Sequence, residues 1–430
     1  MKKRVMPSGT TKTEHLSEAT PIQVPYGSDG IALTLPAGTA LLRPNDPQPQ
    51  TSPARYRQLL TDSLAKTGPD LSRPILVVTD KTRLCAYPDY LPITVSVINE
   101  IRGSAEPFPI VIAYGTHPRQ SDKESLHCYG SLYRDWTFIH HDCDDSGAFT
   151  ECGMTNRGTP IRLRSDLLDA SAVITMGPIC HHYFAGYGGG RKLIFPGCGE
   201  RQAIYRNHGL FLDLRQRRLA SRCHPGIMPA NPIADDLFEV EDYLPAALAI
   251  HGLQDSHGRI CDFLIGSGRE LYHQACLRHG RAFEVESPPQ DIVIASCGGF
   301  PKDLNFIQAH KALHNSAAFV RDGGLLVAFA QCRDGIGSHT FLPWFTIDGF
   351  AGAFDRLAAH YEGNGGTALA MQSKTQRIRI AMISDIDEQT CRLIGVEKWE
   401  IADVEKLLAG PVGRIAWLEN ASLLVRQQSY

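Results

Sequence analysis

The sequence contains no paired-cysteine motif, no strongly charged run and no long apolar segment. Its 12 cysteines are scattered without a CxxC pair or a regular framework, which is typical of reduced thiols in a cytoplasmic enzyme rather than of a disulfide scaffold. The 43 basic and 46 acidic side chains leave a formal net charge of −3. Because no basic run stands out, we expect neither a nucleic acid nor an anionic membrane as a partner.

The sequence also lacks a membrane-spanning segment and a secretion signal. Its most apolar stretch, residues 323–332, is about half as long as a membrane-spanning helix. The amino terminus begins with MKKR but develops no apolar core, so residues 1–22 are predicted to form an N-terminal tail. We therefore expect a cytoplasmic protein.

Short apolar runs bounded by turn-forming residues recur along the chain, and helical stretches such as 54–66 and 93–102 lie between them. The runs are too continuous to alternate between a buried and a solvated face, which is typical of buried parallel strands. The sequence therefore predicts the α/β class with mainly parallel open sheets. The runs are residues 74–80, 108–117, 170–178, 291–299, 323–330 and 377–384.

Mixed charge and a Pro-Pro pair interrupt this pattern around residues 277–290, so we place a domain boundary there. The prediction is two α/β lobes, an N-terminal domain over 23–280 and a C-terminal domain over 288–412, with an active-site cleft between them. A last strand-like segment at the C-terminal end, 413–430, fits either lobe.

Polar residues follow several of the predicted strands. Asp80 and Arg83, His117 and His182 each come directly after an apolar run, where open α/β sheets bind their ligands. An arginine there is suited to bind a carboxylate or phosphate, although an internal Asp80–Arg83 ion pair is an equally good interpretation. Each lone histidine is likewise either a catalyst or a hydrogen-bonded structural residue.

The segment HHYFAGYGGGRKLIFPG, residues 181–197, combines two histidines, four glycines and a lysine before a Pro-Gly pair. It is not a P-loop, because Lys192 is flanked by Arg191 and Leu193, and it is not a dinucleotide fingerprint, because the sixth position from Gly186 is arginine. Glycines at 188–190 would let a flat or charged ligand approach the backbone, with Arg191 and Lys192 nearby. A mobile surface loop is the alternative.

Two further patterns contain potential metal ligands. The run HHDCDD, residues 140–145, offers imidazole, thiol and carboxylate groups, but neighbouring residues rarely converge on one ion without a distant ligand, which favours a polar turn. His310 and His314 are spaced i,i+4 as zinc ligands often are, yet the residues between them lack the glutamate of a zincin. The residues alone identify no metal site.

Taken together, these segments resemble the nickel-dependent lactate racemase family. The resemblance runs in order from about residue 70 to residue 345, and the glycine-lysine segment is its most specific part. The matching segments are TDKTR (79–83), GTHP (115–118), HHD (140–142), HYFAGYGGGRKLIFPG (182–197), NH (207–208) and DIVIASCGGFPKDLNFIQAHKAL (291–313).

The resemblance implies a nickel pincer nucleotide, pyridinium-3-thioamide-5-thiocarboxylate mononucleotide with nickel, attached covalently to Lys192. Two sulfur atoms and one ring carbon of this cofactor bind nickel, so the protein supplies one further ligand, which the matching position makes His208. The resemblance implies that the domain over 23–280 binds the cofactor and that the glycines make room for its flat ring. The other cofactor-binding residues it implies are Asp80, Phe184, Gly189 and Gly190.

The implied reaction is the inversion of C2 of a 2-hydroxy acid by reversible hydride transfer to the cofactor, with His117 and His182 as two bases. The implied substrate-binding residues are Arg83, Gln308 and Lys311. A nucleotide-dependent dehydrogenase or dehydratase on the same scaffold, or a non-catalytic binding protein, are the alternatives.

Departures from the family pattern lie beside the substrate residues. Arg83 is followed by LCAYP instead of a proline pair, Pro118 replaces the usual arginine, and Ile307 stands where lactate-processing members have tyrosine. The expected substrate is therefore lactate or a bulkier, more hydroxylated 2-hydroxy acid such as an aldonate. The expected partners are the enzymes that make the cofactor and insert nickel.

Overall fold

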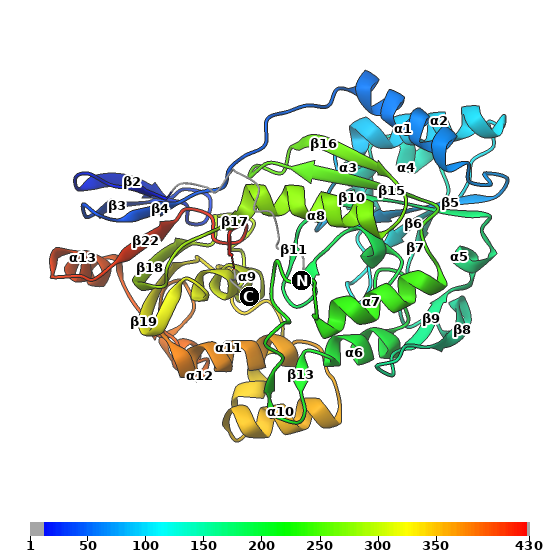
Figure 1. The fold of residues 1–430 in the computed structure, drawn as a ribbon. Helices are drawn as coiled ribbons and strands as arrows, with labels where there is room; N and C mark the ends of the chain where they lie inside the picture. The colour runs from blue at the N-terminus through cyan, green and yellow to red at the C-terminus, as the bar shows by residue number, and fades with distance from the viewer. Residues whose placement is uncertain (1–12, 428–430) are drawn as a thin grey trace, which may run out of the picture. The chain divides into compact units, whose positions relative to one another are not determined.

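A computed structural model describes residues 13–427 of the chain (Figure 1). The chain divides into two compact units. Unit 1 comprises the described residues up to 45, residues 212–220 and the described residues from 283 onward, and unit 2 comprises residues 46–211 and 221–282. Both units combine helices with mainly parallel sheets, so the predicted α/β class is confirmed.

Unit 2 is built on a six-stranded sheet in which only the edge pair β15–β16 is antiparallel. Every residue of the strands at 74–79 and 172–178 is buried, which explains why these apolar runs do not alternate. In spatial order the strands are β16 (Ile260–Gly266), β15 (Leu248–Gln254), β10 (Ala172–Pro178), β5 (Pro74–Thr79), β6 (Ile110–Ala113) and β7 (Phe138–His140).

Helices cover both faces of this sheet. One face packs its core against α1 (Pro53–Thr67) and α2 (Tyr87–Arg102), and the other packs against α8 (Arg269–Phe283). The neighbouring strand residues Phe263 and Leu264 lie in different core clusters, as the alternation of side chains along a strand requires. The other elements of unit 2 are α3 (Asp122–Tyr129), α4 (Leu132–Asp135), α5 (Ser165–Asp169), α6 (Arg201–Gly209), α7 (Pro232–Tyr243), the 3₁₀ helices η1 (Ser146–Ala148) and η2 (Gly190–Leu193), and the strand pairs β8 (Phe149–Met154) with β9 (Pro160–Arg164) and β11 (His181–His182) with β12 (Gly186–Tyr187).

Unit 1 contains a seven-stranded sheet that is parallel except at its first edge pair. In spatial order its strands are β1 (Glu14–His15), β4 (Ala40–Leu42), β22 (Ile415–Leu418), β18 (Gln290–Ser296), β19 (Val320–Phe329), β20 (Arg379–Ile383) and β21 (Glu397–Lys398). The remaining elements are α9 (Phe306–Ala317), α10 (Gly349–Ala359), α11 (Gly365–Arg377), α12 (Glu388–Leu393), α13 (Ile401–Ala409), the 3₁₀ helix η3 (Leu342–Phe345), and the strand pairs β2 (Thr20–Val24) with β3 (Ile31–Leu35), β13 (Leu212–Asp213) with β14 (Arg218–Leu219), and β17 (Glu284–Val285) with β23 (Val425–Arg426).

The chain divides differently from the predicted domains. Residues 23–45, predicted to belong with 46–280, lie in unit 1 because β4 forms a parallel ladder with β22, and the blue N-terminal strands accordingly lie beside red β22 in Figure 1. The hairpin β13–β14 also belongs to unit 1. The segment 413–430, which fitted either lobe, contributes β22 to the interior of the unit 1 sheet, and its last three residues lie outside the described part.

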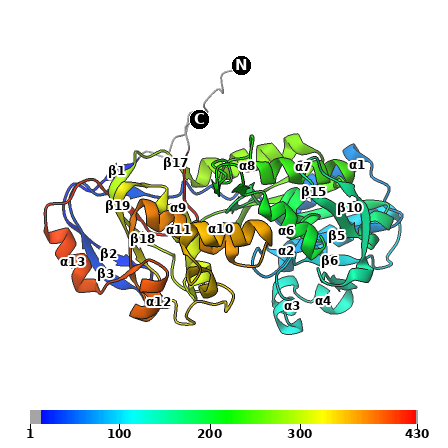
Figure 2. The ribbon, with the colours of Figure 1, turned by 90° about the horizontal axis from the view of Figure 1, so that it is seen from below.

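The predicted N-terminal tail, 1–22, is partly a regular structure. Its described residues contain β1, paired with β4, and the start of β2, while residues 1–12 lie outside the described part of the chain. Figure 2 views the same elements from below. No helix between residues 13 and 427 has the length and apolar character needed to cross a membrane.

Candidate active site

The direction of chain winding reverses beside β5 in the unit 2 sheet. From β5 the chain passes to β6 and β7 on one side, and it later adds β10 and β15 on the other side. Such a reversal leaves a crevice beyond the carboxyl ends of the strands, which is where open α/β sheets bind ligands. The loops after β5, β6 and β10 meet there and enclose a cavity of about 110 Å³.

Seven of the predicted site residues line this cavity, all of them from unit 2. They are Asp80, Arg83, His117, His182, Gly189, Lys192 and His208. Thr79, Tyr114, Thr116 and Ile204 also line it. Thr79 and Thr116 lie inside segments that match the family, but neither was predicted as a site residue, and threonine, tyrosine and isoleucine are common wherever a strand or helix is buried. Sequence positions 80 to 208 are therefore brought to one place by three neighbouring strands.

Asp80 and His117 form a hydrogen-bonded pair. His117 Nδ1 lies 2.7 Å from Asp80 Oδ2, while Thr82 donates its backbone N–H and its hydroxyl to Asp80 Oδ1. Burial by itself would raise the pKa of the Asp80 carboxyl, but the bonds from His117 and Thr82 and the charge of Arg83 hold that pKa below its usual range. Since an ionised carboxylate only accepts, His117 donates from Nδ1, and its Nε2 carries the lone pair of a base.

Arg83 does not pair with Asp80. The one side-chain hydrogen bond of its guanidinium within the described residues is a 3.4 Å contact with Thr82 Oγ1. The alternative of an internal Asp80–Arg83 ion pair is therefore wrong, because the carboxylate is already taken by His117 and Thr82. Arg83 keeps its charge in the cavity and is placed to receive an anion.

His182 is held differently from His117. It lies in the two-residue strand β11, and its Nδ1 accepts the backbone N–H groups of Phe184 (3.3 Å) and Ala185 (3.1 Å). An Nδ1 that accepts carries no proton, so the neutral ring carries its proton on Nε2. His117 and His182 thus enter the cavity in opposite tautomers.

Lys192 lies in η2 and lines the cavity without a counter-ion. Among residues 13–427 its ammonium group makes neither an ion pair nor a hydrogen bond, and the charges that act on it most strongly are those of Arg83 and Arg191. Burial, followed by the positive charges of these two arginines, lowers the pKa of Lys192 to about 7. A substantial fraction of the Lys192 side chain is therefore the neutral, nucleophilic amine at neutral pH.

His208, near the end of α6, donates Nδ1–H to the Ile204 carbonyl at 2.8 Å. This bond fixes the tautomer and leaves the lone pair on Nε2, while burial and the charge of Lys192 lower the pKa of His208 to about 4. The preceding residue, Asn207, is fully buried and donates to Asp236 Oδ2 at 2.7 Å, which fixes α6 and with it the imidazole. Sequence reasoning did not find Asp236.

The glycine-rich loop is tied down by packing within the protein, so it is not the mobile surface loop that the sequence left open. A Cβ at Gly189 would lie 2.4 Å from the Pro178 carbonyl oxygen, and a Cβ at Gly190 would lie 2.6 Å from Tyr272 Cδ2. Below the loop the buried Arg191 guanidinium stacks on the Phe238 ring, 3.9 Å from its centroid. These glycines are needed for the close approach of the loop to its own core.

Four predicted residues lie away from the cavity lining. Gly190 faces Tyr272, and Phe184 is buried in a stacked contact with Phe211, with the ring centroids 4.4 Å apart. Both therefore support the loop through packing. Gln308 and Lys311 lie on α9 in unit 1, where Lys311 Nζ donates to Gln308 Oε1 at 2.9 Å.

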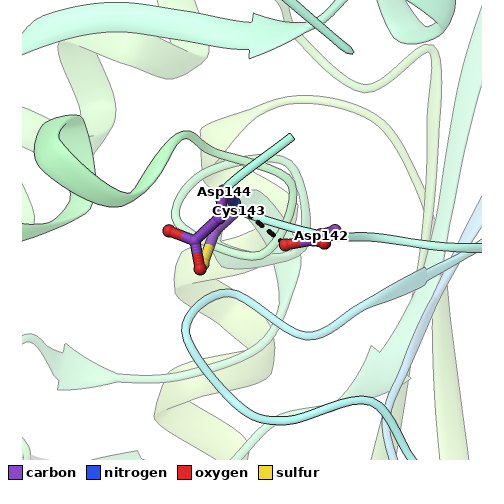
Figure 3. A group of neighbouring side chains, drawn as sticks. All are labelled: Asp142, Cys143 and Asp144. Atoms are coloured by element: carbon purple, nitrogen blue, oxygen red, sulfur yellow. Dashed lines mark hydrogen bonds between the residues drawn. The ribbon is translucent and has the colours of Figure 1, made fainter. Parts of the chain in front are cut away.

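The acidic turn after β7 has its own internal partners. Asp142, Cys143 and Asp144 bring their potential ligand atoms within 4.8 Å of one another, and Figure 3 shows the Asp144 N–H donating to Asp142. Both Asp144 carboxylate oxygens, however, receive hydrogen bonds from Arg201, at 2.6 and 2.7 Å. The arginine already neutralises this carboxylate, which agrees with the polar turn favoured by the sequence.

Comparison with known protein families gives two matches, and both are domains of the same family. Residues 26–219 match the lactate racemase N-terminal domain, and residues 285–355 match the lactate racemase C-terminal domain, so that the two together cover more than half of the chain. The chain belongs to the lactate racemase family. The predicted membership of this family is thereby confirmed.

Two curated members of the family are similar in sequence. The lactate racemase of Thermoanaerobacterium thermosaccharolyticum is 27% identical over 337 residues, which are 75% of this chain and 77% of that protein. The lactate racemase of Lactiplantibacillus plantarum is 25% identical over 283 residues, 65% of each chain.

Two solved structures share the fold of this chain. The lactate racemase apoprotein of T. thermosaccharolyticum superposes with a TM-score of 0.83 at 22% identity, covering 95% of this chain and all of that chain. A protein of Thermotoga maritima superposes with a TM-score of 0.65 at 14% identity, covering 89% of this chain and 99% of that one. At these identities the likeness concerns the fold alone.

Proposed function

We propose that the protein is a racemase or epimerase that inverts C2 of a 2-hydroxy acid, lactate or a related hydroxy acid, with a nickel pincer nucleotide attached to Lys192. The observation that carries this proposal is one cavity that combines an amine without a counter-ion, an imidazole of fixed tautomer and a carboxylate–imidazole pair. Membership of the lactate racemase family supports the isomerase class.

The residues present fit such a cofactor. The Lys192 amine is unprotonated often enough to be acylated, and no carboxylate of the described residues pairs with it. His208 has the arrangement of a metal ligand, since its Nδ1–H is held by a backbone carbonyl and its Nε2 carries the lone pair. The nickel pincer nucleotide, when bound, supplies an acceptor for the hydride from C2 of the substrate.

The chain's own groups bind the substrate and move its hydroxyl proton. Arg83 binds the carboxylate with two parallel hydrogen bonds. His117 Nε2 accepts the hydroxyl proton, and Asp80 stabilises the imidazolium that forms, because it holds the Nδ1–H. We retain Gln308 and Lys311 as further substrate anchors, and the enzymes that make the cofactor and insert nickel as partners.

His182 is proposed to serve the opposite enantiomer. In the tautomer found here its Nε2–H donates a hydrogen bond to the substrate oxygen. To act as a base, the ring must first release the Phe184 and Ala185 amides so that a proton can occupy Nδ1. Both histidines are needed in every complete inversion, because a planar 2-oxo acid receives its hydrogen on either face.

The test is to express the chain with and without the cofactor-making enzymes and to measure intact mass and nickel. We expect a covalent adduct and a single nickel, lost in Lys192→Arg and retained in the exposed control Lys81→Arg, which pairs with Glu124. His208→Ala should keep the adduct and lose nickel. Full adduct and nickel in Lys192→Arg would overturn the cofactor assignment.

A second measurement addresses the reaction itself. A panel of 2-hydroxy acids labelled with deuterium at C2, from lactate to aldonates, is incubated with the loaded protein. Inversion with retention of the label indicates internal hydride return, whereas exchange of the label with solvent would contradict it. Binding without any inversion across the panel would favour a binding protein instead.

A further inference from the structure

The partly buried Lys192 amine lines the cavity as a nucleophile before any cofactor is attached. Lys374 provides a comparison, since it is buried, but its Nζ donates to the Ala370 carbonyl at 2.7 Å and lies 3.3 Å from His314 Nδ1. Lys192 has no such partner within residues 13–427 and lines an open cavity. Of these two lysines only Lys192 is presented to a ligand.

The groups around Lys192 are those that a 2-oxo acid requires. Arg83 lines the same cavity with its guanidinium uncommitted to any carboxylate, so it can hold the carboxylate of the ligand. His117, supported by Asp80, lines the cavity as a base that can also return a proton. Among the described residues of the lining Asp80 alone is acidic, and its carboxylate is bonded to His117 and Thr82.

We infer that the cofactor-free protein captures 2-oxo acids as imines on Lys192. The substrate class rests on the proposed function, because a 2-oxo acid is the oxidised form of a 2-hydroxy acid. Desolvation beside cationic groups is a general way to make a lysine nucleophilic, and the lowered pKa of Lys192 agrees with it.

The reaction balances without a redox partner. The Nζ lone pair attacks C2 of the oxo acid, a C–N bond forms as the C=O π bond breaks, and one Nζ proton passes through the neutral His117 imidazole to the oxygen to give a carbinolamine. His117 Nε2 then takes the second Nζ proton and delivers it to the C2 hydroxyl, so that the C–O bond breaks, water leaves, the C=N bond forms and the imidazole is neutral again. The net change is amine plus oxo acid to imine plus water, and the imine blocks the atom to which the cofactor would attach.

The test uses full-length protein expressed without the cofactor-making enzymes, pyruvate as the probe and cyanoborohydride to trap the imine. We expect one reduced adduct per chain, mapped by peptide mass to Lys192 and absent from Lys374. Lys192→Arg and Lys192→Met should both lose it, with melting temperatures recorded to verify folding. Protein already loaded with the cofactor should not react.

The role of Arg83 is tested by comparing two carbonyl probes. Arg83→Gln should slow capture of both probes, because loss of the nearby positive charge raises the pKa of Lys192. Capture of pyruvate should fall about tenfold or more further than capture of acetone, which has no carboxylate, because only pyruvate also loses a charge-assisted pair. Labelling spread over surface lysines, or pyruvate labelling that survives in both Lys192 variants, would overturn the inference.

The outcomes separate this inference from the proposed function. Nickel loading at Lys192 without pyruvate capture leaves the proposed function standing and removes the imine. Capture of pyruvate without any nickel adduct under co-expression would support the imine and remove the proposed cofactor attachment. If both occur, added pyruvate should slow loading of the cofactor-free protein, and failure to do so would show that the captured imine does not block the attachment site.

Discussion

Replacing Asp80 by asparagine tests the part of the site that moves protons. The Asp80 side chain is 5% exposed and lies 2.7 Å from His117 Nδ1, so the variant removes a buried charge from a direct hydrogen bond. An amide can also present its NH₂ group to Nδ1, which would force the proton of a neutral imidazole onto Nε2. Asp80→Asn therefore weakens the imidazolium and can turn the base into a donor.

The size of the effect follows from these two contributions. A hydrogen bond to a charged group contributes roughly 1.5–3 kcal/mol, which corresponds to about 10- to 100-fold in rate. Tautomer reversal adds to this, and an aspartate-to-asparagine change in a Ser-His-Asp triad costs about 10⁴-fold. We expect kcat to fall about 10²- to 10⁴-fold, with little change in KM because Arg83 is untouched.

The assay is racemisation of an accepted 2-hydroxy acid by protein whose cofactor and nickel content have been measured. Asp62→Asn serves as the control, since Asp62 is exposed on α1 and accepts a hydrogen bond from Gln58 only locally. A fully loaded Asp80→Asn protein that racemises within about twofold of the unaltered protein would refute the role of this pair.

Two further predictions concern stability. In denaturant titration the free energy of unfolding of Gly190→Ala should be lower than that of Gly103→Ala by about 1–3 kcal/mol. Both glycines have positive φ (+53° and +65°), but only at Gly190 would a Cβ meet a ring, 2.6 Å from Tyr272. Equal losses of stability in the two variants would contradict the loop packing. Burial lowers the pKa of His251 to about 4, below its unfolded value near 6.5, so its neutral form contributes stability above pH 6.5 that is lost as pH falls through 4. Between pH 6.5 and pH 4 the free energy of unfolding should therefore fall by roughly 3 kcal/mol less in His251→Gln than in the unaltered protein. Parallel pH profiles of the two proteins would contradict this.

The fold class was predictable because burial on both faces of a sheet leaves a continuous apolar run in the sequence. Such runs occur at residues 74–79 and 172–178. Asp80 and His182 follow the carboxyl ends of these two runs and line the cavity. The partner of a strand leaves no such mark. Nothing in the local pattern of residues 40–42 indicates a ladder with residues 415–418, which is why the N-terminal strands were assigned to the wrong domain.

The site was predictable to the level of residue identity but not of pairing. Spacing allowed an ion pair between Asp80 and Arg83, whereas in the fold the Asp80 carboxylate bonds His117, which follows the neighbouring strand. The tautomers of His117 and His182 depend on such contacts and could not be predicted. The glycines were expected to leave room for a ligand, but Gly190 is constrained by Tyr272, a residue far along the chain.

The pairing of Asp80 with His117 also determines the charge that a ligand meets. Had Asp80 neutralised Arg83, the cavity would offer no uncommitted cation, and the amine of Lys192 would lie beside a neutral ion pair with less reason to lose its proton. With Asp80 committed elsewhere, Arg83 both attracts an anion and suppresses protonation of Lys192. One hydrogen bond therefore links the binding of an acid to the nucleophilicity of the lysine.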